Sequence, residues 1–268
     1  MKLVSPTLQH WINDRQRATF LDMVTPRLEP APPVDFIPEH VIDRRAANGP
    51  QLPIDVLRAG SLVADMRTMP RKKHYDPRER FVQNGVDFGK FGWFRDNDPR
   101  RNMPIRSTPR GTIPWPRLTG ILLHITAVDM HAARFLGVPA QLGVAREIDG
   151  NAAAVLMHAI NTKCWHAHAA NRFTLGIEVS SADGTITDAQ IETLRALIRY
   201  AYTERQRNHA GRMVIMAHRQ SHKSRGRDPG AIVWQQGAVW AMREFGLELG
   251  PVVGSGRSIP AIWWGAAA

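Results

Sequence analysis

The stretch Ile121-Leu122-Leu123-His124-Ile125-Thr126 decides the fold, because an apolar run of this length predicts a buried β-strand. Side chains alternate between the two faces of a strand. Ile121, Leu123 and Ile125 therefore form one apolar face, and His124 lies on the other. A His inside such a run costs free energy unless its nitrogens are satisfied. By itself, the position fits a core His bonded to a backbone carbonyl.

Two further strand candidates carry similar polar residues. In the apolar run 174–180, Glu178 faces away from Ile177 and Val179, and burying an unpaired carboxylate is costlier than burying a His. By itself, Glu178 fits a buried ion pair. The apolar run 213–217 ends directly before His218, which opens a basic loop that closes at Asp228-Pro229-Gly230, a turn signal.

The segments around these strands are typical of an α/β domain. Thr187 followed by Gln190 forms a capping-box pattern, and helical spacing continues to Tyr202. The remaining predicted elements are short helix 129–136, strands 141–148 and 152–157 around the turn Asp149-Gly150, and closing helix 232–245. We therefore predict a mixed central β-sheet flanked by helices.

The first 112 residues differ in composition and hydrophobic pattern from the rest of the chain. Helical periodicity covers 8–23 and 54–66, a Pro-rich segment covers 26–38, and a basic segment with aromatic residues covers 81–101. We predict three parts, an irregular, partly helical extension over 1–112, an α/β domain over 113–249 and a tail over 250–268. Aromatic residues among cations can stack on sugars or bases, although an arm that keeps its charges in water is the simpler interpretation.

Composition restricts the class of protein and its partners. The 268 residues include 43% hydrophobic and 22% charged residues, which is typical of a globular chain. The net charge of +11 favours polyanions such as nucleic acid, anionic lipid or the acidic polymers of a bacterial envelope. Cys164 is the single cysteine, so any metal must be held by His and carboxylate. We expect no membrane span and no secretory signal at the N-terminus.

His124, Glu178, His218 and Asp228 together suggest a chemistry that none of them suggests alone. Two His and one carboxylate are ligands that zinc prefers in catalytic sites, where a fourth position stays open for water. The other carboxylate can then act as the base that takes a proton from this water.

In order and spacing, these motifs resemble the zinc-dependent N-acetylmuramoyl-L-alanine amidases, the superfamily of phage endolysins, muropeptide-recycling amidases and peptidoglycan recognition proteins. The resemblance covers roughly residues 115–247. It is carried by the segments 122–127, Trp165-His166-Ala167 with Asn171, 175–178, His218-Arg219 and 228–230.

The resemblance implies a mixed sheet with a glycopeptide groove and one Zn²⁺ per chain. It implies His124, His218 and Asp228 as the zinc ligands and Glu178 as the catalytic base, as in the branch that uses Glu. The branch that uses Tyr places it at a position that corresponds here to Leu142. Residues expected to bind substrate are Trp165, His166, Asn171 and Arg219.

One position departs from the family pattern. Family members often carry a Lys two residues before the third ligand, where it stabilises the developing oxyanion, and this chain has Gly226 there. Lys223, Arg225 or Arg227 could supply the charge from a shifted loop, and Arg225 is the choice made here.

We therefore expect a zinc amidase that cleaves the bond between N-acetylmuramic acid and L-alanine. Bacterial peptidoglycan is the expected partner, with anionic envelope polymers, and nucleic acid is bound only non-specifically. Two alternatives are a non-catalytic peptidoglycan-binding module and a virion structural or nucleic-acid-binding protein with an amidase-like fold. We expect synthesis in the cytoplasm and action on the cell wall, as a phage lytic enzyme or an exported effector rather than a recycling enzyme.

Overall fold

A computed structural model of the chain describes residues 62–69, 75–92, 109–147 and 150–265, which all lie within the compact unit Leu52–Ala266. The segments predicted over 8–23 and 26–38 lie outside the described residues. No helix among the described residues is long and apolar enough to cross a membrane.

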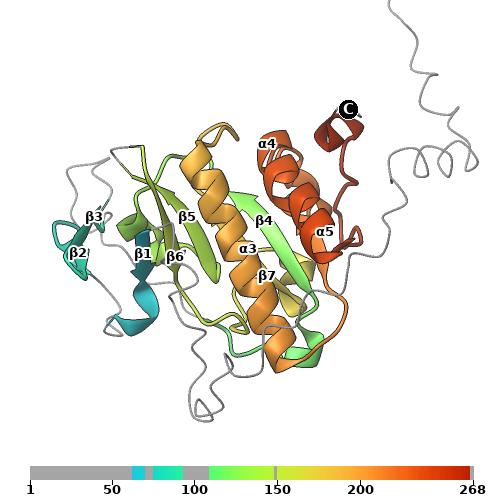
Figure 1. The fold of residues 1–268 in the computed structure, drawn as a ribbon, viewed down its shortest axis with the longest axis horizontal. Helices are drawn as coiled ribbons and strands as arrows, with labels where there is room; N and C mark the ends of the chain where they lie inside the picture. The colour runs from blue at the N-terminus through green and yellow to red at the C-terminus, as the bar shows by residue number, and fades with distance from the viewer. Residues whose placement is uncertain (1–61, 70–74, 93–108, 148–149, 266–268) are drawn as a thin grey trace, which may run out of the picture. The chain divides into compact units, whose positions relative to one another are not determined.

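A seven-stranded sheet forms the centre of this unit (Figure 1). Its order is β1 (Leu62–Asp65), β6 (Ala152–Leu156), β5 (Leu142–Arg146), β7 (Thr174–Val179), β4 (Gly120–Ile125), β8 (Val214–Ala217) and β9 (Glu248–Leu249). The β5–β6 pair is antiparallel and the other neighbours are parallel. The predicted mixed sheet flanked by helices is therefore confirmed.

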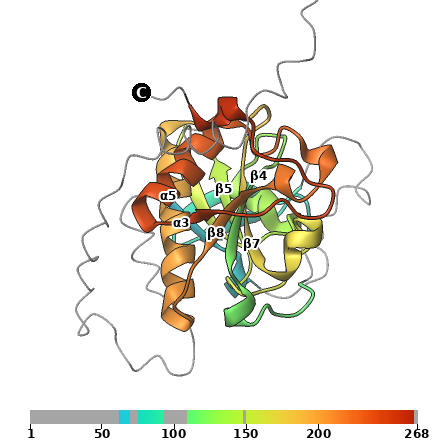
Figure 2. The same ribbon diagram turned by 90° about the vertical axis from the view of Figure 1, so that its right-hand side faces the viewer.

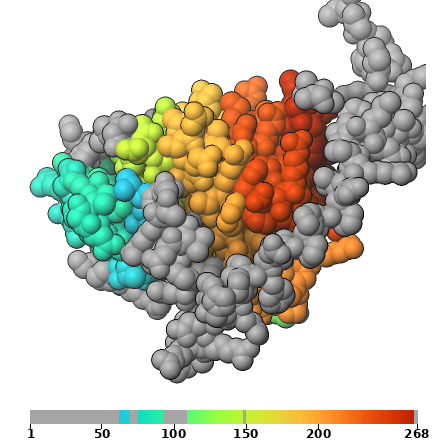
Figure 3. Space-filling view, in the orientation of Figure 1, coloured from blue at the N-terminus to red at the C-terminus, as the bar shows by residue number. Residues whose placement is uncertain are grey.

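Helices cover one face of the sheet. Figure 2 shows α3 (Asp188–Asn208) and α5 (Trp240–Phe245) together on one side of β4, β7 and β8. Thr187 caps α3 through the predicted capping box with Gln190. The predicted closing helix consists of α4 (Ala231–Val233), a π-helical segment Trp234–Val239 and α5. The helices form a continuous surface in Figure 3, and under them lies the largest apolar core.

The sheet begins earlier in the chain than the predicted domain limit at 113. Leu62–Asp65 forms the edge strand β1, which pairs in parallel with β6, so the helix predicted over 54–66 is wrong for these four residues. Tertiary pairing with β6 overrides the local helical pattern here. The strands β2 (Arg80–Gln83) and β3 (Val86–Lys90) form a hairpin that contacts this edge strand. The side-chain oxygen of Gln83 accepts a hydrogen bond of 2.7 Å from the backbone N–H of Asp65.

A second apolar core fills this end of the unit. It joins the hairpin to the 3₁₀ segment Ala132–Gly137, where the sequence predicted a short helix. Its aromatic members are Tyr75, Phe81, Phe88, Phe91 and Phe135. The aromatic segment predicted as part of an arm therefore contributes, in its described part, to the packed interior.

The C-terminal segment is a packed part of the same unit. After β9 the chain continues to a 3₁₀ turn, Ala261–Trp264, in which Trp263 is buried. The ring of Trp264 contacts Trp234 edge-on, with centroids 5.7 Å apart. The described part of the predicted tail over 250–268 thus covers the closing helix.

Candidate metal centre

The register of the central strands brings the polar residues of β4 and β7 side by side. His124 on β4 is paired with Glu178 on β7, and Leu122 with Gly176. Both pairs lie on the face of the sheet opposite α3. Because β4, β7 and β8 run in parallel, their carboxyl ends meet at one edge. His218 follows β8 directly at this edge.

Three side chains converge here. The Nδ1 atoms of His124 and His218 lie 2.7 Å apart, and His218 Nδ1 lies 2.8 Å from Oδ2 of Asp228. All three residues are buried, and their ligand atoms lie within 4.8 Å of one another. The other carboxylate oxygen of Asp228 accepts a hydrogen bond of 2.9 Å from the backbone N–H of Ile125, which fixes the carboxylate.

The arrangement of these three atoms is better explained by binding of a metal ion than by hydrogen bonds among them. A hydrogen on His218 Nδ1 cannot be donated fully to both His124 and Asp228, its two close neighbours. The Nε2 atom of His218 is buried and has no hydrogen-bond partner within the described residues. Two imidazoles and one carboxylate form a donor set that zinc prefers, with one position left for water or substrate.

Glu178 lies at the edge of this cluster. Its carboxylate is 3.7 Å from Nδ1 of His124. Burial, and then the carboxylate of Asp228, raise the pKa of Glu178 to about 8, while the guanidinium of Arg225 opposes the rise. Burial, followed by the neighbouring imidazoles and Arg225, holds the pKa of His124 well below its ordinary value, so the contact joins a carboxyl group to a neutral ring. A pKa near neutrality suits a group that must both take and return a proton.

Arg225 is the loop cation that acts on this cluster. It is exposed, in the 3₁₀ turn Lys223–Arg225, yet its charge influences both His124 and Glu178. Among the described residues, Lys223 and Arg227 are not among the charges that shift the pKa values of His124, His168 and Glu178. This electrostatic difference supports the choice of Arg225, whose catalytic role stays a prediction.

Arg219 has a different environment from the one expected of a substrate-binding residue. Its Nη1 donates to the carbonyl of Gly226, and its guanidinium lies 5.0 Å from the ring centroid of Trp263. Its backbone N–H donates to the Asp228 carbonyl at 3.0 Å. Arg219 therefore stabilises the loop that carries Asp228, the third candidate ligand.

His166 and Asn171 are also buried, which differs from the expected position along the substrate groove. His166 Nδ1 lies 2.9 Å from Nε2 of His124, behind the candidate ligand. The side-chain oxygen of Asn171 accepts from the backbone N–H groups of His166 and Ala167 at 2.9 and 2.6 Å. A glycine in a central strand, Gly176, is the sequence signal that could have indicated a ring packed against β7.

Trp165 has the exposure expected of a groove residue. Its side chain is 55% exposed, and the guanidinium of Arg110 lies 4.9 Å from the ring centroid. Arg110 lies outside every motif that the sequence singled out, so it was not predicted. An exposed indole beside a cation is suited to stacking on a sugar.

Leu142, which was aligned with the Tyr position of the other family branch, does not face the cluster. It belongs to the core beneath α3, whereas its neighbour Gly143 is registered with Glu178. By the alternation of the strand, Leu142 lies on the same face as Ile177, away from Glu178.

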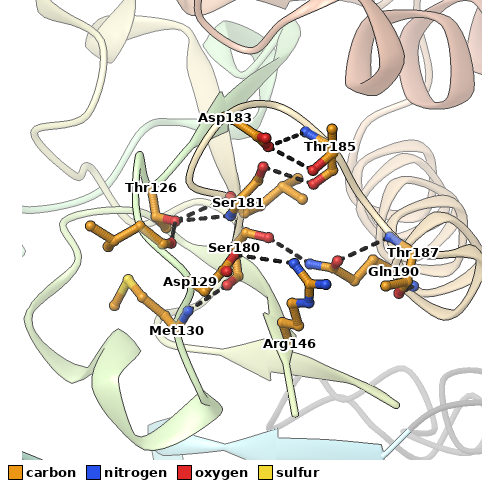
Figure 4. A network of polar contacts seen from close by, with 12 residues as sticks. Thr126, Asp129, Met130, Arg146, Ser180, Ser181, Asp183, Thr185, Thr187 and Gln190 are labelled. Carbon is orange, nitrogen blue, oxygen red and sulfur yellow. Dashed lines mark hydrogen bonds and ion pairs between the residues drawn. The ribbon is translucent and has the colours of Figure 1, made fainter. Parts of the chain in front are cut away.

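Hydrogen bonds fix the segment that follows Glu178 (Figure 4). The Ser180 hydroxyl accepts from the backbone N–H of Met130 at 2.6 Å, and the Ser180 carbonyl accepts from the Gln190 side chain at 2.6 Å. The backbone N–H of Ser181 donates to the Thr126 hydroxyl at 3.2 Å. These bonds connect the carboxyl ends of β4 and β7 to the beginning of α3.

Comparison with known proteins finds a family that matches part of the chain. Residues 114–231 match the N-acetylmuramoyl-L-alanine amidase family, which confirms the resemblance inferred from the motifs. No curated protein sequence matches the chain.

Solved structures with similarity to the chain include three named hydrolases. The endolysin amidase LysCS from Clostridium intestinale is 17% identical over 47% of this chain and 84% of its own, with a TM-score of 0.36. The Ph2119 endolysin from a Thermus scotoductus bacteriophage is 15% identical over 55% and 94%, with a TM-score of 0.34. The amidase AmiD from E. coli, solved with an anhydro-N-acetylmuramic acid peptide, is 18% identical over 63% and 66%, with a TM-score of 0.36.

Proposed function

We propose that this chain, whose residues 114–231 belong to the N-acetylmuramoyl-L-alanine amidase family, is a zinc-dependent hydrolase of the bond between N-acetylmuramic acid and L-alanine in peptidoglycan. The observation that carries the proposal is the buried cluster of His124, His218 and Asp228 with Glu178 beside it. All four residues lie within the matched region.

The three clustered residues would hold one zinc ion. When bound, zinc would polarise the lactyl carbonyl and lower the pKa of the attacking water. Its positive charge would also favour the ionised form of Glu178. The donor set leaves room for these roles because it provides three protein ligands rather than four.

Glu178 would transfer the proton. It takes a proton from water as the new C–O bond forms and returns it to the nitrogen as the C–N bond breaks. The products are a lactyl carboxylate and the free amino group of L-alanine. Arg225 would stabilise the negative charge that develops on the carbonyl oxygen. Trp165 is the candidate for contact with the sugar.

Digestion of purified peptidoglycan tests the proposal. The expected products are new amino-terminal L-alanine residues, with loss of activity after chelation and recovery when stoichiometric zinc is added back. Binding of zinc and peptidoglycan without new L-alanine termini would instead support the alternative of a non-catalytic binding module. Cleavage at sugar–sugar or peptide cross-link bonds would contradict the bond assigned here.

We further propose that the chain acts on the polymeric cell wall, as a phage lytic enzyme or an exported effector. The net charge of +11 supports this setting because envelope polymers are anionic. The proposal predicts faster hydrolysis of intact sacculi than of soluble muropeptides. It also predicts lysis when an added export signal directs the chain to the periplasm, and none when the chain stays in the cytoplasm. A preference for soluble muropeptides would instead indicate recycling.

A further inference from the structure

His166 is connected at both ring nitrogens. Its Nδ1 lies 2.9 Å from Nε2 of His124, and its Nε2 lies 3.2 Å from the backbone carbonyl oxygen of Thr174. The two rings meet edge-on, with centroids 5.1 Å apart. A continuous chain of polar atoms therefore runs from the backbone of β7 through His166 to a candidate zinc ligand.

This chain of contacts determines where the hydrogens lie. A carbonyl oxygen only accepts, so the hydrogen of His166 is on Nε2. Burial disfavours a charged ring, which leaves Nδ1 of His166 as an acceptor. His124 must then donate from Nε2, and the lone pair of its Nδ1 is free. This Nδ1 is the atom that faces His218 at 2.7 Å and Glu178 at 3.7 Å.

The position of the His166 ring depends on Gly176. A Cβ atom on Gly176 would lie 2.6 Å from Nδ1 and 2.9 Å from Cγ of His166, closer than side chains approach. The backbone on the other side of the ring is fixed by Asn171, whose oxygen accepts two backbone hydrogen bonds. The ring is thus placed by its neighbours before any metal binds.

We propose that His166 is a positioning residue, which uses the Thr174 carbonyl to fix His124 in the tautomer whose Nδ1 faces the metal. The inference rests on the proposed zinc site. Residues that support a metal-binding His in this way typically change metal affinity or activity by about 10–100-fold when they are replaced. Here the supporting partner is a second imidazole, which is itself oriented by a main-chain carbonyl.

The test compares zinc affinity and tautomer in matched variants of the full chain. His166→Phe keeps a ring but removes both hydrogen bonds, and His166→Asn offers an amide oxygen in place of Nδ1. We expect His166→Phe to weaken zinc binding by about 10–100-fold in competition with a chromogenic chelator, and His166→Asn to recover part of this loss. His131→Phe makes the same chemical change at a half-buried His bonded to the Arg146 carbonyl, and should leave zinc affinity unchanged.

Imidazole ¹⁵N spectra of the metal-free protein give a readout independent of activity. Wild-type His124 should be protonated at Nε2, and His166→Phe should produce a mixture of tautomers. If His166→Phe does not fold, Gly176→Ala tests the same connection by displacing the ring. Wild-type zinc affinity in these folded variants, or a wild-type His124 protonated at Nδ1, would overturn the inference. A wild-type chain that binds no zinc would instead refute the proposed function.

Discussion

The two faces of β4 and β7 are made by alternate residues of the same strands, yet they differ in what stabilises them. On the face beneath α3, Leu123 and Ile177 are fully buried among aliphatic side chains. On the opposite face, His124 and Glu178 lie side by side. Gly176, two residues before Glu178, leaves room on this face for the ring of His166. The first face contributes free energy of folding through apolar burial, and the second holds polar groups that fit a metal ion.

This comparison teaches that neighbouring residues of one strand can have separate roles. Substitutions on the α3 face should change stability and leave the chemistry intact. Substitutions on the opposite face should change the chemistry and change stability little, as long as the metal site is loaded.

The largest expected effect comes from Glu178→Gln. Removing the base should reduce turnover on peptidoglycan by about 10²–10⁴-fold while zinc content stays at one ion per chain. Glu192→Gln, which alters an exposed carboxyl on α3, is the matched control. Undiminished release of L-alanine termini by Glu178→Gln would show that another group takes the proton.

Arg225→Ala should have the next largest effect on turnover. Loss of an oxyanion-stabilising group reduces turnover by about 10²–10³-fold, and the effect should appear in kcat rather than in zinc affinity. Lys223→Ala removes a cation from the same turn and should change kcat little. Equal losses in both variants would mean that the loop acts only through its general charge.

The face beneath α3 is tested by Ile177→Ala, next to Glu178. Deleting this buried side chain should lower the free energy of unfolding by about 2–5 kcal/mol in denaturant titrations. Turnover per folded molecule should remain close to that of the wild type. A fall in turnover without a change in stability would break the distinction between the two faces.

Metal-free protein should show the cost of burying Glu178. Since its pKa is raised from 4.5 to about 8, the folded chain retains a proton that the unfolded chain loses. The free energy of unfolding should therefore fall as pH rises from about 5 to about 8, on the order of a few kcal/mol relative to Glu178→Gln. If the free energy of unfolding changed with pH in the same way in the wild type and in Glu178→Gln, this prediction would be contradicted. Added zinc should make the free energy of unfolding of the wild type depend less on pH.

The smallest effect is expected at the beginning of α3, which covers the apolar face. Thr187→Ala removes the cap and should lower the free energy of unfolding by about 1 kcal/mol, with no change in turnover. Thr187→Ser retains the hydroxyl and should stay close to the wild type. An equal loss for Thr187→Ser and Thr187→Ala would show that packing of the methyl group, which both variants remove, matters more than the cap.

The sequence predicted the elements whose signals are local. The strands containing His124 and Glu178 and the capped helix after Thr187 were predicted because alternation and capping depend on residues close together in the chain. The order of motifs also predicted which ligands would meet, and the family match confirms that resemblance. The catalytic and metal-binding roles stay predictions.

Features that depend on distant partners were not predictable in the same way. The strand Leu62–Asp65 acquires its conformation by pairing with Ala153–Leu156, far along the chain. The position of His166 depends on His124 and on the absence of a side chain at Gly176, neither of which is visible from the motif around His166. Propensity and periodicity carry no information on such long-range contacts.

The close approach of His166 to Gly176 has a consequence for the evolution of related chains. Residues 166 and 176 are complementary in size, so substitutions at the two positions should occur together. A relative with a side chain at the position of Gly176 should lack an imidazole at the position of His166, and its first His ligand should then be oriented by a different acceptor. The pair would thus serve as a covariation marker that separates lineages by how they support the metal rather than by which residues bind it.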